Sequence, residues 1–89
     1  MNSKFDLEKG NLASSASLKE LVLWDDDKRN IEHKIESLVY ICQMSEKESI
    51  NIVLDCLLDG SAKITTGEHE RLIRLQEVFQ RNLMTTTIE

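Results

Sequence analysis

The sequence contains no proline, only three glycines and only four aromatic residues. Proline and glycine interrupt helices and mark turns, so their scarcity favours helical segments over a turn-rich β structure. The few aromatic side chains imply a core built mainly from aliphatic residues. We therefore expect one domain of the all-α class, a small bundle of three to four helices.

Long apolar runs and cysteine motifs are missing as well. No run approaches the roughly 20 apolar residues that a membrane-spanning helix needs, and the N-terminus lacks the pattern of a signal peptide. The two cysteines, Cys42 and Cys56, are expected to be reduced and buried, because no CxxC or histidine-rich spacing accompanies them. These absences predict a cytoplasmic, bacterial protein without membrane contact, metal or cofactor.

The domain is expected to span residues 17–84. Residues 1–16 lack sustained periodicity and predict a flexible N-terminal arm, while the threonine-rich residues 85–89 predict a frayed tail. Between them, apolar spacing and cap signatures predict helices. Their ranges are about 18–24, 28–43, 45–59 and 67–84.

The clearest helix runs from Met44 to Gly60. It opens with a capping box, Ser45 with Glu48, and ends at a glycine suited to a left-handed cap. Its apolar residues cover more than one side, and Leu54 is expected in the core. Ile52 and Cys56 have no evident cover from the flanking helices. Either the N-terminal helix with Trp24 covers them, or a second chain does.

The last helix carries a narrow apolar seam at helical spacing. Leu75, Phe79 and Leu83 form this seam together with Leu72, much like the edge of a coiled coil. We interpret Ile52, Cys56, Leu75, Phe79 and Leu83 as residues of a partner or dimer interface. This interpretation predicts a protein that binds another protein and associates with itself.

No residue pattern indicates catalysis. His33 and His69 each stand among glutamates and are expected to be ordinary surface side chains. The Asp25–Asp27 run is expected to cap the following helix, because adjacent carboxylates point in different directions. No Ser–His–Asp order, phosphate loop or cofactor fingerprint is present. The sequence therefore predicts a protein that is not an enzyme and has no small-molecule substrate.

The formal net charge is −5, which disfavours general binding to nucleic-acid phosphates. Arg71, Arg74 and Arg81 nevertheless share the outer side of the last predicted helix and could form a nucleic-acid face. Arg74 and Arg81 each follow a glutamate by four residues, which is equally typical of a solvated face. A helix-turn-helix-like DNA-binding transcriptional regulator is therefore the alternative function.

One family resemblance accompanies these patterns. The apolar spacing from Ile31 to Phe79, with the turn Met44-Ser45-Glu46-Lys47, resembles the small helical two-component connector proteins of enteric bacteria. These are the biofilm and acid-resistance regulators of AriR type. The resemblance implies a non-enzymatic dimeric regulator that touches a response-regulator pathway. The leading hypothesis is a small bacterial regulatory protein that acts through protein–protein binding as a homodimer.

Overall fold

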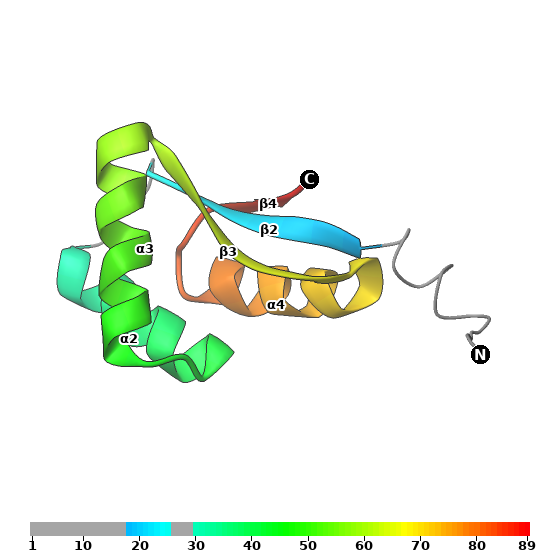
Figure 1. The fold of residues 1–89 in the computed structure, drawn as a ribbon. Coiled ribbons are helices and arrows are strands. Elements are labelled where there is room, and N and C mark those ends of the chain that lie inside the picture. The colour runs from blue at the N-terminus through cyan, green and yellow to red at the C-terminus, as the bar shows by residue number, and fades with distance from the viewer. Residues whose placement is uncertain (1–17, 26–29) are drawn as a thin grey trace, which may run out of the picture.

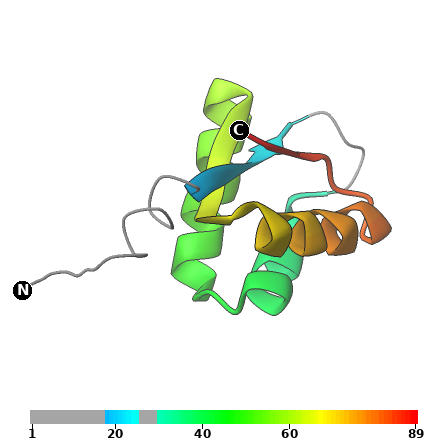
Figure 2. The same ribbon diagram turned by 90° about the vertical axis from the view of Figure 1, so that its right-hand side faces the viewer.

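The computed structural model describes residues 18–25 and 30–89. This part of the chain forms a three-stranded sheet and three helices, in the order β2 (Leu18–Trp24), α2 (Ile31–Cys42), α3 (Glu46–Asp59), β3 (Ser61–Glu68), α4 (His69–Arg81) and β4 (Thr86–Ile88). The strand order is β3-β2-β4, and β2 runs antiparallel to both neighbours. The sheet lies over α4, and the hairpin of α2 and α3 stands at one end of it (Figures 1 and 2).

The prediction of an all-α bundle is wrong, because two of its segments are strands. The capping pattern in residues 17–20 suggested a helix at 18–24, but this segment is β2. Leu21 and Leu23 belong to the core cluster, and Val22 between them is also buried. A short continuous apolar run of this kind is consistent with a buried strand. Residues 61–68, expected to form a loop and the start of the last helix, are β3. Their β-branched residues Ile64, Thr65 and Thr66 favour a strand.

The C-terminal residues also differ from the expectation. Thr86–Ile88, placed in a frayed tail, form β4, which pairs with Leu21–Leu23 of β2. Glu20 and Glu89 exchange two backbone hydrogen bonds of 2.8 Å beyond this strand. The predicted flexible arm, residues 1–16, lies outside the described residues.

Within the helical hairpin of α2 and α3, the cap signatures in the sequence predict both ends of α3. The capping box at the start of α3 is confirmed: the Ser45 hydroxyl accepts from the Glu48 amide at 3.1 Å, and the Glu48 carboxylate accepts from the Ser45 amide at 3.3 Å. Gly60 ends α3 at φ 87°, a left-handed conformation that glycine adopts at little cost. The cap of α2 is Asn30 and not the expected Asp25–Asp27 run, and the Asn30 side chain accepts from the His33 amide at 2.7 Å.

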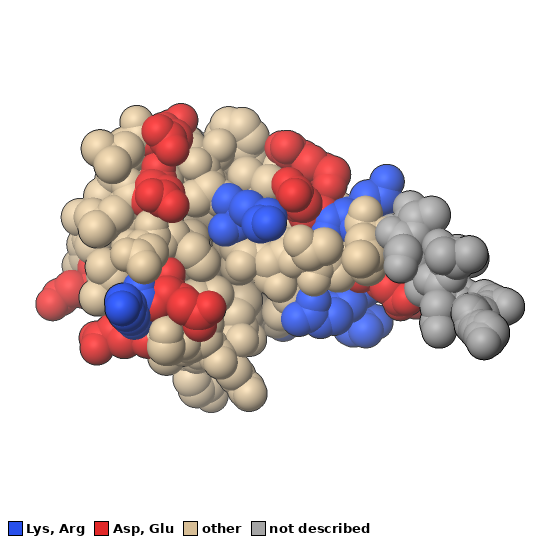
Figure 3. Space-filling model, in the orientation of Figure 1, with Lys and Arg blue, Asp and Glu red and all other residues tan. Residues whose placement is uncertain are grey.

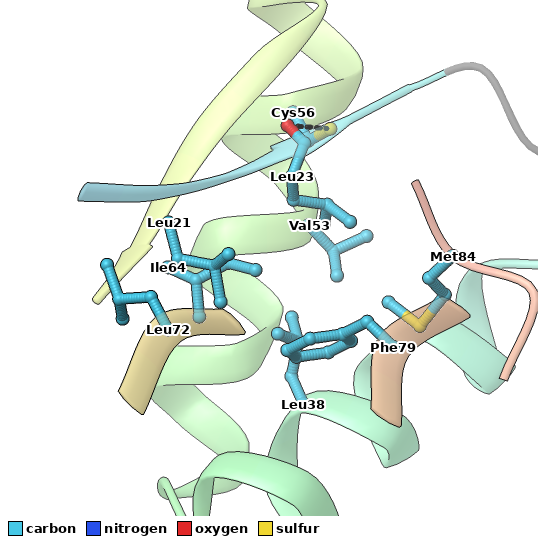
Figure 4. Packing of buried hydrophobic residues seen from close by; sticks show 9 residues of the cluster. All are labelled: Leu21, Leu23, Leu38, Val53, Cys56, Ile64, Leu72, Phe79 and Met84. Carbon is cyan, nitrogen blue, oxygen red and sulfur yellow. Dashed lines mark hydrogen bonds between the residues drawn. The ribbon is translucent and has the colours of Figure 1, made fainter. Parts of the chain in front are cut away.

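The core lies where the sheet, α4 and the hairpin meet. Figure 4 shows Leu23 of β2 and Val53 of α3 close to Phe79 of α4. The buried apolar cluster consists of Leu21, Leu23, Leu38, Val53, Cys56, Ile64, Leu72, Phe79 and Met84. Every described helix and strand except β4 contributes a residue to this cluster, and Ile88 of β4 packs against it. The cluster therefore joins the two halves of the fold.

Leu54 is not part of this core, because 48% of it is exposed, whereas Leu38 is fully buried. We expect Leu38→Ala to lower the free energy of unfolding by about 2–5 kcal/mol, since it leaves a cavity. Leu54→Ala should cost less than about 1 kcal/mol, because it removes little buried surface. Urea denaturation of both variants measures this, and a larger loss for Leu54→Ala would contradict the placement.

Candidate interaction surfaces

Four large apolar residues lie exposed along one side of α3. Their exposed fractions are 36% for Ile50, 48% for Leu54, 40% for Leu57 and 82% for Leu58. The spacing i, i+4, i+7, i+8 places them on one continuous helical face. We call this surface the α3 stripe. The sequence showed that α3 is apolar on too many sides, but it did not show which side stays in contact with solvent.

The opposite side of α3 is held against the rest of the chain. The Ser49 hydroxyl, fully buried, donates to the Ile35 carbonyl at 2.7 Å. The Cys56 thiol donates to the Leu23 carbonyl of β2 at 3.5 Å (Figure 4). Segment 18–24 of the same chain therefore covers Cys56, as a strand rather than as the expected helix.

The structure distributes the five predicted interface residues over very different environments. Cys56 and Phe79 are 2% and 0% exposed and belong to the core of this chain. Ile52 and Leu75 are partly buried and pack against that core. Leu83 is 54% exposed and has a positive φ of 62° just after α4. Among the five, only Leu83 is more than half exposed to solvent in this chain.

Acidic side chains surround the α3 stripe. The helix contains Glu46, Glu48, Asp55 and Asp59 against the single cation Lys47, so its formal charge is four negative and one positive, or −3. In the view of Figure 3, acidic side chains lie over the upper and lower parts of α3, with uncharged surface between them. A partner of positive charge would therefore be attracted to this side of the molecule.

An ion pair between a buried lysine and a partly exposed aspartate joins the end of β2 to the hairpin. The Lys34 ammonium lies 3.2 Å from an Asp25 carboxylate oxygen, and Lys34 is only 4% exposed. The Asp25 amide also donates to the Gly60 carbonyl at 3.0 Å. Sequence reasoning missed this pair, because Lys34 sits among residues of an ordinary amphipathic helix and its burial depends on the approach of β2.

A second surface feature lies along α2. It is an open groove of about 570 Å³, and its lining includes His33, Glu36, Ser37, Tyr40, Glu46 and Asn82. We call it the α2 groove. The His33 Nε2 atom lies 2.9 Å from the Asn82 carbonyl oxygen, to which it can donate, so α2 is tied to the end of α4. His33 thus has a structural contact, whereas His69 is exposed at the start of α4.

The three arginines of the predicted nucleic-acid face are exposed on α4. Arg71 donates to the Thr66 carbonyl at 3.4 Å, so its guanidinium folds back on β3. Arg74 and Arg81 are seven residues apart, about two turns, and share a side of the helix. Their role in binding nucleic acid stays a prediction.

Other sites are absent from the described residues. Within 18–25 and 30–89, no group of three or more histidine, cysteine, aspartate or glutamate side chains could hold a metal ion. No helix in the same part of the chain is long and apolar enough to cross a membrane. Cys42 and Cys56 are both free thiols.

Comparison with known families gives a clear result. Residues 15–85 match the family model described as "ATP-dependent Clp protease adaptor protein ClpS". The chain belongs to the ClpS family. No curated protein matches the sequence. A solved structure of Agrobacterium tumefaciens ClpS2 bound to L-phenylalaninamide has a similar fold, with a TM-score of 0.76 at 20% identity, over 82% of this chain and 95% of that chain.

Membership of the ClpS family corrects the resemblance to AriR-type regulators, which is wrong. That resemblance depended on apolar helical spacing, which α2, α3 and α4 of a ClpS fold also produce. Since ClpS proteins are adaptors, the prediction that the chain is not an enzyme is confirmed. An adaptor acts by binding other proteins, so the expected mode of action is confirmed in this general form.

The ion pair between Asp25 and Lys34 of this ClpS chain predicts a measurable coupling. A double-mutant cycle with Asp25→Asn and Lys34→Met should give about 1–3 kcal/mol, because the pair is charged and its Lys34 side is shielded from water. The coupling should persist at about 0.5 M salt, since burial limits screening. Glu70 and Arg74, which are exposed and four residues apart on α4, are the control and should give no more than about 0.3–0.5 kcal/mol. Equal couplings would contradict a structural role for Lys34.

Burial raises the pKa of the Cys42 thiol, while the positive charge of Arg71 partly lowers it. A raised pKa means less thiolate, so iodoacetamide should modify Cys42 more slowly in the folded chain than in urea at about pH 8. Arg71→Gln should slow the reaction further, and Arg81→Gln should leave it unchanged. Peptide mapping by mass spectrometry follows Cys42 separately from Cys56. Faster labelling of Arg71→Gln would contradict the electrostatic contribution.

Proposed function

We propose that this chain is an adaptor for an ATP-dependent Clp protease and that it holds a protein through the α3 stripe. The observation that carries the proposal is the exposure of Ile50, Leu54, Leu57 and Leu58 on a helix whose other side is firmly packed. A contiguous apolar face of this kind on a small protein is typical of a protein-binding surface.

The geometry of the α3 stripe suits a groove or helix on the partner. Residues at i, i+4, i+7 and i+8 are the contacts that a helical interface uses, and two such faces bury each other's apolar side chains. The stripe is also presented rigidly, because the Ser49 hydroxyl and the Cys56 thiol fix the back of α3. A rigid surface loses less conformational entropy on binding than a mobile one.

The ligand of the solved ClpS2 structure supports an apolar contact. L-phenylalaninamide combines a large apolar side chain with a free amino group. We propose that the protein delivered by this chain likewise offers an apolar side chain next to a positive charge. The acidic residues around the α3 stripe would speed the encounter with such a partner more than they strengthen the final complex.

Three further predictions concern the cellular location, a homodimer and DNA binding. An adaptor shares a compartment with its protease, so cytoplasmic localisation belongs to the proposal. A homodimer through the α3 stripe would bring two helices of charge −3 together, and like charges disfavour that contact. The homodimer and the DNA-binding alternative both stay predictions.

Degradation by a purified Clp ATPase and peptidase tests the proposal. The substrate is a fluorescent protein that begins with phenylalanine, and the chain is added over a range of concentrations. We expect the native chain to change the rate of fluorescence loss with saturation. The variant Leu54→Gln/Leu58→Gln should need at least about 10-fold more protein, because two apolar anchors of about 1 kcal/mol each are lost.

Leu83→Gln is the matched control, since it also replaces an exposed leucine with glutamine but lies outside α3. It should behave like the native chain. Loss of effect in Leu83→Gln but not in the α3 variant would move the contact to the sequence-predicted interface. No effect of the native chain on the protease would refute the adaptor proposal.

A further inference from the structure

We propose that the α2 groove is a second protein-binding site, which takes a short extended segment carrying arginine or lysine next to an apolar side chain. The groove shares none of its lining residues with the α3 stripe. The α2 groove is therefore a different surface from the α3 stripe. An adaptor must hold two proteins at once, and two independent surfaces would allow this.

The charge of the lining argues for a cationic segment. Two carboxylates, Glu36 and Glu46, line the groove, and no lysine or arginine lines it. Both glutamates are exposed, and neither is in an ion pair with another of the described residues. Two carboxylates beside one groove attract a cation and repel an acidic segment.

Tyr40 gives the groove an aromatic wall. It is 86% exposed and lies in the last turn of helix α2, which ends at Cys42. A tyrosine ring can stack on a guanidinium or cover an apolar side chain, and its hydroxyl can form a hydrogen bond. Val39 adds apolar surface to the same lining. The groove thus offers both parts of the proposed ligand a matching contact.

The end of the groove is held in place before any ligand arrives. His33 Nε2 lies 2.9 Å from the Asn82 carbonyl oxygen, and the Ser37 hydroxyl lies 3.5 Å from the same nitrogen. The Asn82 side chain in turn donates to the Val78 carbonyl at 2.8 Å. These contacts fix α2 against the end of α4, so binding needs little ordering of the groove.

The chain contains a single tyrosine, which makes a direct measurement possible. With ¹³C-labelled tyrosine, every labelled ring signal in the NMR spectrum comes from Tyr40 and therefore reports on the groove. The probe is a 10-residue peptide of alternating leucine and arginine, and the comparison peptide has glutamate in place of arginine. We expect the leucine–arginine peptide to shift the Tyr40 signal with saturation and the leucine–glutamate peptide to leave it unchanged.

The variant Glu36→Gln/Glu46→Gln should bind the leucine–arginine peptide at least about 5-fold more weakly, because both attractive charges are removed. Glu70→Gln/Glu77→Gln removes two exposed carboxylates from α4 and is the matched control, with native affinity expected. Circular dichroism checks that all variants are folded. Because no protease is present, the result is independent of the adaptor proposal.

Three outcomes of the peptide experiments would overturn the inference. They are no shift of the Tyr40 signal, an equal shift with the leucine–glutamate peptide, and equal weakening by both pairs of glutamate substitutions. The last would indicate attraction to the overall negative charge rather than to the groove. A ring shift that depends on protein concentration without peptide would instead assign the groove to a contact between two copies, and would also overturn it.

Discussion

The central position of β2 is the constraint on which the other contacts depend. Its partners β3 and β4 both come from the second half of the chain, and its register with them places Leu21 and Leu23 in the core. The Leu23 carbonyl then accepts the Cys56 thiol, which orients α3. Every contact of this kind joins residues more than 30 positions apart, so the fold forms only when the two halves of the chain meet.

The two candidate surfaces follow from this arrangement. Once the Cys56 side of α3 is fixed beneath β2, the helix must expose the opposite side, and the apolar residues there form the α3 stripe. In the same way, packing of α2 between α3 and the end of α4 leaves Tyr40 and Glu36 in solvent. The α3 stripe lies on the hairpin alone, whereas the α2 groove is formed by the hairpin together with Asn82 at the end of α4. A small adaptor can thereby present two chemically different faces.

Local sequence patterns predicted the hairpin well and the sheet poorly. The caps at Ser45 and Gly60 are interactions within a few residues, and they set the ends of α3 in any fold. The capping pattern at Ser17 and Glu20 was equally plausible locally, yet the segment became β2. A strand is stabilised by its neighbours in the sheet, and those neighbours lie 37 to 67 residues away. The sequence also could not show which side of α3 is exposed, because the segment that covers its other side, β2, is distant in the sequence.

The sequence by itself determined that the chain is a small, acidic, mostly aliphatic domain with a capped hairpin and without catalytic motifs. Composition, charge and local capping are properties of residues or short segments, so they survive any tertiary arrangement. Only the tertiary structure decided that Cys56 and Phe79 are core residues, that Lys34 is buried beside Asp25, and that Leu54 faces solvent. Burial depends on which segment covers a side chain, and here the deciding cover is the strand β2.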